Sequence, residues 1–447
     1  MKPGTMRWVD RWLGVPLCAA LTVHRWVCGF LRRAPEKVNR IVLVKLAEQG
    51  STVLAYAAIR RAIGLVGKEN VFFLVFKENR FILDLLDLVP RANILTIPTG
   101  SPAALGKGLI VAIMRMRREK IDAAIDLEFF ARSSAALCYL SGAARRVGFH
   151  ARDGGGPWRG DLMTHRLSYN PHLHTSQVFA MQVESLNVPP GQLPALATPV
   201  PGAEGTAPLA RFTQHQVEET RAILETAAGR QDLPQLVLLN PNCSDLLPLR
   251  MWPPEHYVQL ARLLLDKYPQ LHLAFTGAPG EAKTASRLVE EVGSERCFSL
   301  AGQTTLEQLI VLYAMARVLV TNDSGPAHFA TLTPVEVVTL FGPETPRLFA
   351  ARSERNHVLW AGLPCSPCVS AFNNRNSACH DNLCMQSITV RQVFEEVCGI
   401  LDQHDGARSA TAGAVASHKV EGGQARIQAA PRHALQECGP SPHAHVG

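Results

Sequence analysis

Residues 316–328 form an apolar, β-branched run that stops abruptly at a polar Asp-Ser-Gly-Pro turn. This pattern is typical of a buried parallel strand that leads directly into a helix. Gly325 lets a ligand approach the backbone closely, and the free N–H groups at a helix start attract anions. We therefore expect a phosphate-binding loop here, formed by Asp323, Ser324, Gly325 and His328. The alternative is a turn that only caps the helix.

A second turn of the same kind follows the next apolar run. Residues 335–340 are apolar or β-branched for most of their length and lead into a Gly-Pro turn at residues 341–346. In an open α/β sheet, ligands bind at the carboxyl ends of the strands. Two successive turns at one sheet edge therefore favour a binding site over two unrelated caps.

Apolar strand patterns and helical patterns alternate along most of the chain, which is typical of doubly wound α/β domains. We expect strands at residues 40–46, 71–76, 93–97, 121–127, 236–240, 271–276, 316–322 and 335–340. A Pro-, Gly- and Ala-rich stretch between them indicates a linker. The expected organisation is an apolar N-terminal segment at 1–34, domains at 35–190 and 213–403 joined by a linker at 191–212, and a disordered tail at 404–447.

Composition narrows the class of ligand. The chain has 447 residues, of which 47% are hydrophobic and 19% charged, so two globular domains can each bury a core. The formal net charge is +7, only 6% of residues are aromatic, and no nucleic-acid-binding motif is found. This combination favours small anionic ligands or acidic lipid over nucleic acid.

The N-terminal segment is apolar and rich in tryptophan. Its unbroken apolar stretch, residues 12–23, is shorter than the ~20 residues that a spanning helix needs, and no Ala-x-Ala-like cleavage site follows it. We expect a helix in the membrane interface, with Trp8, Trp12 and Trp26 at headgroup level. A helix that simply packs on the first domain is the alternative.

Four ordered motifs resemble glycosyltransferase family nine, the ADP-heptose:lipopolysaccharide heptosyltransferases. The resemblance extends from about residue 39 to 401, and its most specific parts are residues 322–328 and 340–346. Residues 250–253 and 277–281 resemble two further elements of the family. The resemblance implies a GT-B fold, with two Rossmann-like domains facing a central cleft. It also implies an inverting transferase that moves a sugar from a nucleotide diphosphate such as ADP-heptose to a cell-surface glycolipid or polysaccharide. The cytoplasmic face of the inner membrane is the implied location.

The resemblance also implies roles on the donor side. Asp323 would contact the donor sugar, the backbone around Ser324 and Gly325 would face the diphosphate, and Glu281 would contact the nucleoside. Arg250 would neutralise the charge that builds on the leaving diphosphate, so catalysis requires no cofactor or metal. His328 either donates to the phosphates or is hydrogen-bonded within its helix, and Arg250 is alternatively a surface cation.

The acceptor side departs from the family pattern. Ser51 stands where the family's general base is usually acidic, and a serine hydroxyl needs help to accept a proton at neutral pH. Glu48 in the same loop is the nearest carboxylate and our predicted catalytic base, with Asp126 and Glu128 as the next candidates. Lys45 would hold an acidic group of the acceptor. Alternatively, Glu48 is a solvated loop residue and Lys45 a strand-end lysine.

Two further elements resemble the family. Arg145 and Arg146, followed by glycines at 154–156, resemble an acceptor-side loop in which cations meet an anionic glycolipid. A solvated charge pair before a flexible loop is the alternative. His174 matches a histidine that the family carries before a long helix, where it caps the helix or contacts the other domain.

Four of the eleven cysteines cluster, with Cys365 and Cys368 two residues apart and Cys379 and Cys384 close behind. Such spacing predicts a structural zinc site, with His380 as a substitute ligand. Free thiols or a disulfide remain open as alternatives.

Fold and motif do not determine the substrate. Two other functions therefore stay open: a sugar-nucleotide epimerase or hydrolase on the same fold, and a catalytically silent sugar-nucleotide-binding subunit.

Overall fold

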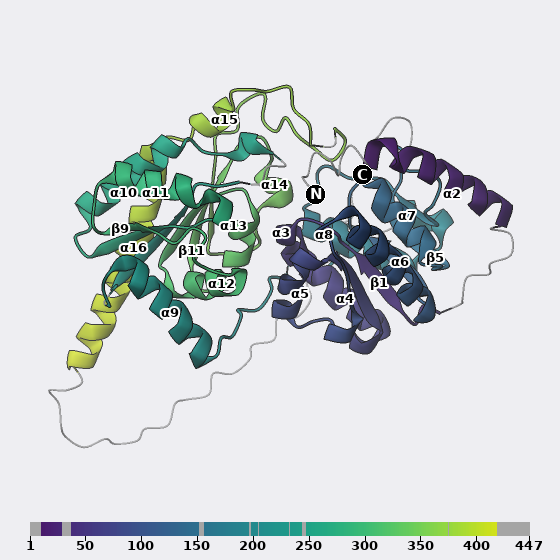
Figure 1. Cartoon of the computed structure of the whole chain (residues 1–447), viewed down its shortest axis with the longest axis horizontal. Coiled ribbons are helices and arrows are strands. Elements are labelled where there is room, and N and C mark those ends of the chain that lie inside the picture. The colour runs from purple at the N-terminus through teal and green to yellow at the C-terminus, as the bar shows by residue number, and fades with distance from the viewer. Residues whose placement is uncertain are drawn as a thin grey trace, which may run out of the picture. The chain divides into compact units, whose positions relative to one another are not determined.

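The computed structural model describes residues 10–28, 37–151, 156–195, 198–203, 205–231, 233–243, 247–373 and 375–417. Trp8, Gly154 and Gly155 therefore lie outside the described residues. The described chain contains two six-stranded sheets in which all the paired strands are parallel, with helices on both faces (Figure 1). This confirms the expected pair of doubly wound α/β domains.

The N-terminal sheet has the order β3-β2-β1-β4-β5-β6. Its strands are β1 (Ile41–Val44), β2 (Val71–Phe76), β3 (Ile94–Ile97), β4 (Ala123–Asp126), β5 (Arg145–Phe149) and β6 (His165–Leu167). Its main helices are α3 (Gln49–Leu54), α4 (Tyr56–Val66), α5 (Arg80–Leu86), α6 (Pro102–Arg118), α7 (Arg132–Leu140) and α8 (Thr175–Glu184).

The C-terminal sheet repeats the arrangement in the order β12-β11-β10-β7-β8-β9. Its strands are β7 (Gln235–Asn240), β8 (Leu271–Phe275), β9 (Cys297–Ser299), β10 (Val318–Asn322), β11 (Glu336–Phe341) and β12 (Asn356–Trp360). Its helices are α9 (Gln214–Ala228), α10 (Pro254–Lys267), α11 (Ala282–Val292), α12 (Leu306–Met315), α13 (Gly325–Ala330), α14 (Pro346–Phe349), α15 (Leu383–Gln386) and α16 (Val390–Ser417).

Strand order places a topological switch point in each sheet. β1 pairs with both β2 and β4, and β10 pairs with both β7 and β11, so the chain reverses direction across the sheet at β1/β4 and at β7/β10. The carboxyl ends of strands beside a switch point are where doubly wound folds bind ligands. Glu128 follows β4 and Asp323 follows β10, so both positions lie at such a point.

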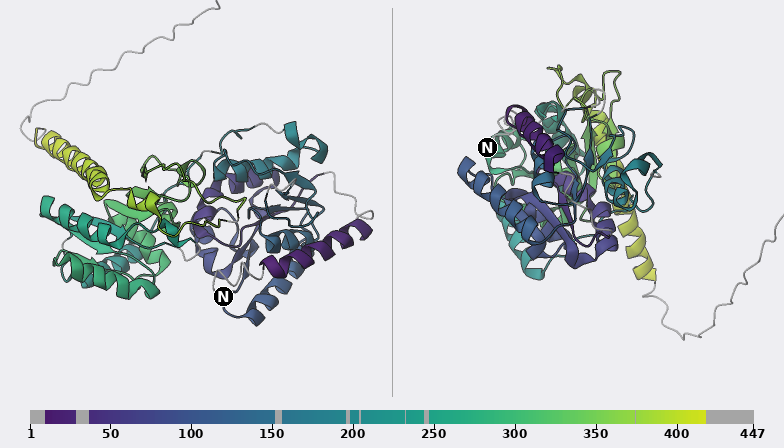
Figure 2. Two further views of the ribbon diagram at one scale, coloured as in Figure 1. Left: turned by 90° about the horizontal axis from the view of Figure 1, so that it is seen from above. Right: turned by 90° about the vertical axis from the view of Figure 1, so that its right-hand side faces the viewer.

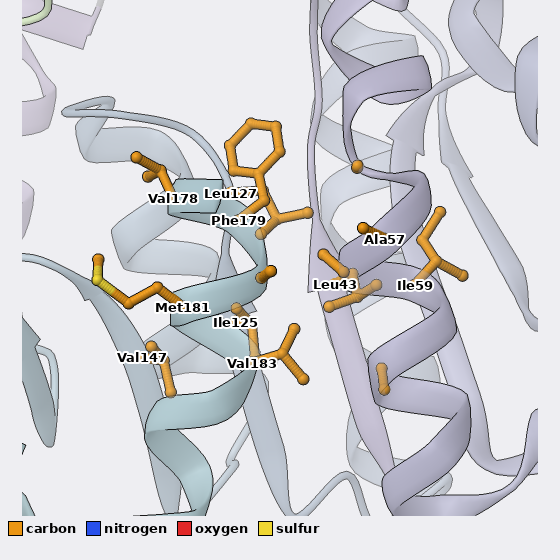
Figure 3. Packing of buried hydrophobic residues seen from close by; sticks show 14 of the residues in the cluster. Leu43, Ala57, Ile59, Ile125, Leu127, Val147, Val178, Phe179, Met181 and Val183 are labelled. Carbon is orange, nitrogen blue, oxygen red and sulfur yellow. The ribbon is translucent and has the colours of Figure 1, made fainter. Parts of the chain in front are cut away.

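The sheets are buried on both faces, as their continuous apolar runs predict. In the N-terminal domain Leu43 and Ile125 are fully buried between α4 and α8, where Ile59 and Phe179 close the same core (Figure 3). The other face of that sheet is covered by α6 and α7, with Cys18 of the first described helix in the same cluster.

One loop of the C-terminal domain packs on the N-terminal domain. After β12 the chain runs through residues 361–382 before α15, and Phe372 in this loop lies edge-on to Tyr169 at a ring separation of 5.2 Å. The ring of Phe130 lies 6.3 Å from the ring of Phe372, and Ala371 is buried in the N-terminal core. We call residues 361–382 the crossing loop.

The first described helix, α2 (Gly14–Cys28), lies on the surface of the N-terminal domain. Gly14, Cys18 and Thr22, spaced four residues apart, form its buried side. A Cβ at Gly14 would lie 2.8 Å from the Arg132 side chain, so glycine permits this close packing. No helix among the described residues is long and apolar enough to cross a membrane.

Two expectations need correction. Residues 145–149, expected as a loop, form strand β5, which pairs with β4 and is buried along the whole run after Arg145. The expected disordered tail was to begin at 404, but α16 continues to Ser417, where alanine-rich sequence favours helix. Residues 418–447 lie outside the described residues.

Candidate functional site

A short loop after β10 presents the donor-side residues. Asn322, fully buried at the end of β10, donates to the carbonyls of Pro241 and Asn242 and accepts from the backbone N–H of Trp252. The β10 end is thereby fixed to the segment that carries Arg250. Ser324 occupies the N-cap position of α13, but its hydroxyl donates to the Asn322 carbonyl instead of capping the helix.

Asp323 and Glu344 form a buried carboxylate pair with Arg250. The side chains of Asp323 and Glu344 are 5% and 3% exposed, and Nη1 of Arg250 lies 3.7 Å and 3.9 Å from them. Burial raises the pKa of Asp323, and the neighbouring Glu344 carboxylate raises it further, against the lowering effect of Arg250. The two carboxylates therefore need nearby positive charges to stay ionised, and Arg250 and Arg375 supply them.

Arg375, from the crossing loop, joins the two domains at this point. Its Nε lies 3.2 Å from Glu344, and its Nη1 contacts the carboxylate of Glu48 in the N-terminal domain. The guanidinium also lies over the rings of Phe129 and Phe349. Arg375 thus neutralises carboxylates of both domains in an apolar surrounding.

The loop after β1 holds Glu48 in position. Glu128 accepts hydrogen bonds from the backbone N–H groups of Leu46 and Ala47, and its second oxygen lies 3.1 Å from Nζ of Lys45. Glu48 adopts a left-handed φ of 64°, unusual for a residue with a side chain, which turns the chain into α3. The conformation persists because several contacts hold the loop.

Three groups contact the carboxylate of Glu48. Besides Arg375, Nζ of Lys45 lies 3.5 Å away and the Ser51 hydroxyl donates to Oε2 at 3.2 Å. Burial by itself would raise the pKa of Glu48, but Arg375, Lys45 and Arg250 together hold this pKa well below its usual range. The carboxylate of Glu48 is therefore ionised and hydrogen-bonded to Ser51, the residue at the position where the family's base is expected.

His328 links this loop to the donor side. A Cβ added at Gly50 of α3 would lie 2.6 Å from Cδ2 of His328 and 3.4 Å from the Cα of Gly325, so the starts of α3 and α13 are in close contact. Burial lowers the pKa of His328 to about 4, so the imidazole is neutral at pH 7. Its Nδ1 has no hydrogen-bond partner within the described part of the chain.

Three more buried polar atoms at the site lack hydrogen-bond partners among the described residues: Oδ2 of Asp323, Oε1 of Glu344 and Nε of Arg250. A buried polar atom without a partner is costly, and such groups need an explanation. Together with Nδ1 of His328 they form a set of two carboxylate oxygens, one charged donor and one imidazole nitrogen. A polar, anionic ligand would satisfy them.

Glu281 and Lys45 lie at the same sheet edges as this cluster. Glu281 follows β8, two strands away from β10, and accepts from the backbone N–H of Ala278. A ligand reaching from Asp323 to Glu281 would therefore cross the end of β7. Lys45 is fully buried, and its ammonium is already bonded to Glu128 and the Ala47 carbonyl.

Arg145 and Arg146 do not join this cluster. Both stand at the start of β5, the amino end of the sheet and thus the edge opposite Lys45. Arg146 donates to the carbonyls of Leu162 and Ala143, and Arg145 lines a cavity of about 760 Å³ at that edge. The structure therefore does not bring these arginines to the cluster at the carboxyl edge, and the acceptor role expected for them stays a prediction.

Asp126 and His174 have structural contacts. Asp126 is fully buried and accepts from Arg159 at 2.7 Å and from Ser134. Burial raises the pKa of Asp126 to about 6 despite this arginine. His174 caps α8 through the Ser176 N–H and contacts the carbonyl of Ala350 in the other domain, as the capping and interdomain interpretation predicts.

The cysteines do not gather around a metal site. No group of three or more His, Cys, Asp or Glu side chains in the described ranges is arranged to hold a metal ion. Cys384 is buried in the C-terminal core, whereas Cys365 is exposed, and all four clustered cysteines are free thiols. A zinc ion that draws them together stays a prediction.

Sequence reasoning missed Arg375 and gave Glu344 no role. Arg375 lies in an irregular loop with no periodic pattern, so only the fold reveals what it contacts. Glu344 could have been predicted as a site residue, because it belongs to the Gly-Pro turn after β11 that we expected at the binding edge.

Comparison with known proteins identifies relatives of the chain. The model of glycosyltransferase family 9 (heptosyltransferase) matches residues 111–378. Lipopolysaccharide heptosyltransferase 2 of Salmonella typhimurium is 33% identical over 115 residues, which is 25% of this chain and 32% of that protein. The matched segment thus spans about a third of that relative.

Two solved structures share the fold over most of the chain. The structure of E. coli ADP-heptose lps heptosyltransferase II aligns with a TM-score of 0.63 at 19% identity, covering 82% of this chain and 99% of that one. A glycosyl transferase of family 9 from Veillonella parvula aligns with the same TM-score at 15% identity, covering 82% and 98%. These likenesses confirm the expected GT-B architecture.

Proposed function

Because the chain belongs to glycosyltransferase family 9, the heptosyltransferase family, we propose that it transfers a heptose or a related sugar, with inversion, from a nucleotide diphosphate donor. The proposed acceptor is a saccharide or glycolipid of the lipopolysaccharide type. The observation that carries the proposal is the buried cluster at the two switch points, where Arg250, Asp323 and His328 have polar atoms without hydrogen-bond partners within the described ranges.

In the proposed reaction the acceptor hydroxyl oxygen attacks C1 of the donor sugar while its proton passes to the carboxylate of Glu48. The bond between C1 and the phosphate oxygen breaks, and its electron pair leaves with the nucleoside diphosphate. Ser51 hydrogen-bonds to Glu48 and orients it. A base within hydrogen-bond reach of the hydroxyl contributes about 10²–10⁴-fold in rate.

The leaving diphosphate gains negative charge, and Arg250 is placed to stabilise it beside the start of α13. A guanidinium binds phosphate oxygens in a bidentate manner and keeps its charge at all working pH values. The proposed step therefore requires no divalent cation. Asp323 would accept from hydroxyl groups of the donor sugar, and Glu281 would contact the nucleoside.

We also propose that the protein works at the inner face of the cytoplasmic membrane, with α2 in the headgroup region. Trp26 on α2 and Trp12 just before this helix are 61% and 60% exposed, and exposed tryptophans favour the boundary between lipid and water.

The test is calorimetric titration of the purified chain with a panel of sugar nucleotides that includes ADP-heptose. We expect tight binding of one donor, and loss of that binding in Asp323→Ala. Asp266→Ala on α10 is the matched control and should bind as the parent does. Absence of binding across the panel would contradict the proposal, and steady release of nucleotide without any acceptor would favour a hydrolase instead.

A further inference from the structure

Helix α6 carries an apolar stripe on its outer side that its packing does not explain. Its inner side, Gly108, Ala112 and Met116, is buried on the N-terminal sheet. Ile110, Val111 and Met114 point away from the sheet and are 59%, 51% and 57% exposed. Three large apolar side chains side by side in water mark an interaction surface.

This stripe and the exposed side of α2 belong to one face of the N-terminal domain. Cys18 of α2, Ala112 of α6 and Ala135 of α7 lie in the same buried cluster, so all three helices cover the same side of the sheet. Both views in Figure 2 show α2, in purple, and α6, in blue, along the same side of this domain.

Exposed apolar side chains concentrate on this face. Of the fifteen large hydrophobic side chains that are exposed among the described residues, seven lie between residues 12 and 27 and three lie on α6. A single exposed residue needs no explanation, but ten on α2, the two residues before it and α6 do. We call these ten side chains and the basic residues beside them the two-helix face.

The charges of this face identify the kind of partner. Lys107 and Arg118, one helical turn before and after the apolar stripe, are exposed and make no ion pair with any described residue. The nearby acids are already bonded: Glu119 to Arg115, Asp161 to Arg25 and Asp10 to Arg132. The surplus charge is therefore positive.

An apolar centre with tryptophans and flanking lysine or arginine is what a helix in the interface of an anionic bilayer requires. We infer that the two-helix face binds the surface of a membrane containing anionic phospholipid, with Ile110, Val111 and Met114 of α6 entering the interface beside α2. The inference rests on the proposed function only in that a lipid-linked acceptor brings the enzyme to a membrane. The inference adds α6 to the membrane-binding surface proposed for α2, and two helices together orient the N-terminal domain relative to the lipid.

The α6 stripe contributes to membrane binding in a way that α2 alone cannot. One short interfacial helix can roll about its own axis, whereas two helices fixed on one domain define a plane. α2 is tied to the domain by Arg25 with Asp161, and the residues just before it are tied by Asp10 with Arg132, so its exposed side cannot rotate independently. Removing the α6 stripe alone should therefore weaken binding even with α2 intact.

The experiment is flotation of the full chain with vesicles of phosphatidylethanolamine and phosphatidylglycerol, compared with vesicles of phosphatidylcholine alone. We expect the parent to float with the anionic vesicles, and the variant I110S/V111S/M114S to lose about tenfold or more in partitioning. K107E/R118E should lose binding to anionic vesicles and become insensitive to salt. The control is Leu263→Ser on α10, which removes a leucine that is 43% exposed on the other domain and should float normally.

Three outcomes would overturn the inference: a parent that floats with neither vesicle, a triple variant that floats like the parent, or a parent dimer that the triple variant breaks without any effect on flotation. In the last case the face binds a second copy of the chain. Transfer to a water-soluble acceptor is measured in parallel. Loss of flotation with transfer intact supports the membrane surface, whereas a parent without transfer contradicts the proposed function and leaves the flotation result valid.

Discussion

The guanidinium of Arg375, in the C-terminal domain, contacts the carboxylate of Glu48, in the N-terminal domain. The same guanidinium lies 3.2 Å from Glu344, beside Asp323. The cluster that we assign to the donor and the carboxylate that we assign as the base are therefore joined by one side chain. Changes at either end are expected to affect the other.

Replacing Glu48 with Gln should abolish most of the turnover while donor binding persists. The amide keeps the shape of the side chain but cannot take the acceptor proton, so kcat should fall about 10²-fold or more. Initial rates and donor calorimetry on the same preparation measure the two effects. Glu69→Gln, at an exposed position of the same domain, should match the parent. Full turnover in Glu48→Gln would remove Glu48 from the mechanism.

Replacing Arg375 with Gln should change the pH dependence of kcat/KM. Arg375 is the strongest of the neighbouring charges that hold the pKa of Glu48 below its usual range. Without it that pKa rises, so the carboxylate becomes protonated, and activity falls, at a higher pH than in the parent. Arg375→Lys keeps a cation and should keep most of the parent profile. Identical acid limbs in the parent and Arg375→Gln would show that Glu48 does not control the rate.

Substituting Gly50 with Ala should weaken both stability and donor binding. The added Cβ would lie 2.6 Å from the His328 ring, so α3 and α13 would have to separate. The matched control is Gly64→Ala in α4, where a Cβ meets nothing within 4 Å. That control should be neutral or stabilising by up to about 1 kcal/mol, because alanine favours helix. Thermal unfolding and donor affinity of the two variants test the contact, and equal behaviour would disprove it.

Stability should depend on pH through His174. Burial, followed by the nearby Arg352, lowers the pKa of His174 to about 4 from an ordinary value of 6.5. Between these values the unfolded chain binds a proton that the folded chain does not, so this contribution is fully present above 6.5 and is lost as pH falls toward 4. His174→Gln should remove on the order of 1–3 kcal/mol of that dependence. Thermal melts at pH 7 and pH 5 measure it, with the exposed His215→Gln as a control; an unchanged slope in His174→Gln would contradict the assignment.

The sequence predicted the elements whose hydrophobic pattern is continuous and locally defined. Strands β1, β2, β7, β8, β10 and β11 lie where apolar runs predicted them, and the two Gly-Pro turns do fall at one sheet edge. Short strands such as β5 and β6 were missed, because three to five residues carry too little periodicity to distinguish a strand from a loop.

The candidate site was predicted where its residues belong to a turn motif and was missed where contacts cross domains. Asp323 and Arg250 come together because strand order and Asn322 bring their loops together. Arg375 is 327 residues away from Glu48 in sequence, and no local pattern encodes that contact. Arg145 and Arg146 are adjacent in sequence, and this local pattern suggested an anion site. The strand order places both at the amino end of β5, away from the cluster at the carboxyl edge.

The crossing loop holds the N-terminal domain by two contacts of different physical kinds. Phe372 packs among the rings of Tyr169 and Phe130, a contact that ions in solution barely affect, whereas Arg375 binds through opposite charges, which ions screen once the pair meets water. We expect that release of product in the proposed reaction requires these contacts to open. Raising the ionic strength should therefore speed product release while leaving the aromatic contact as the slower, temperature-dependent part of the opening.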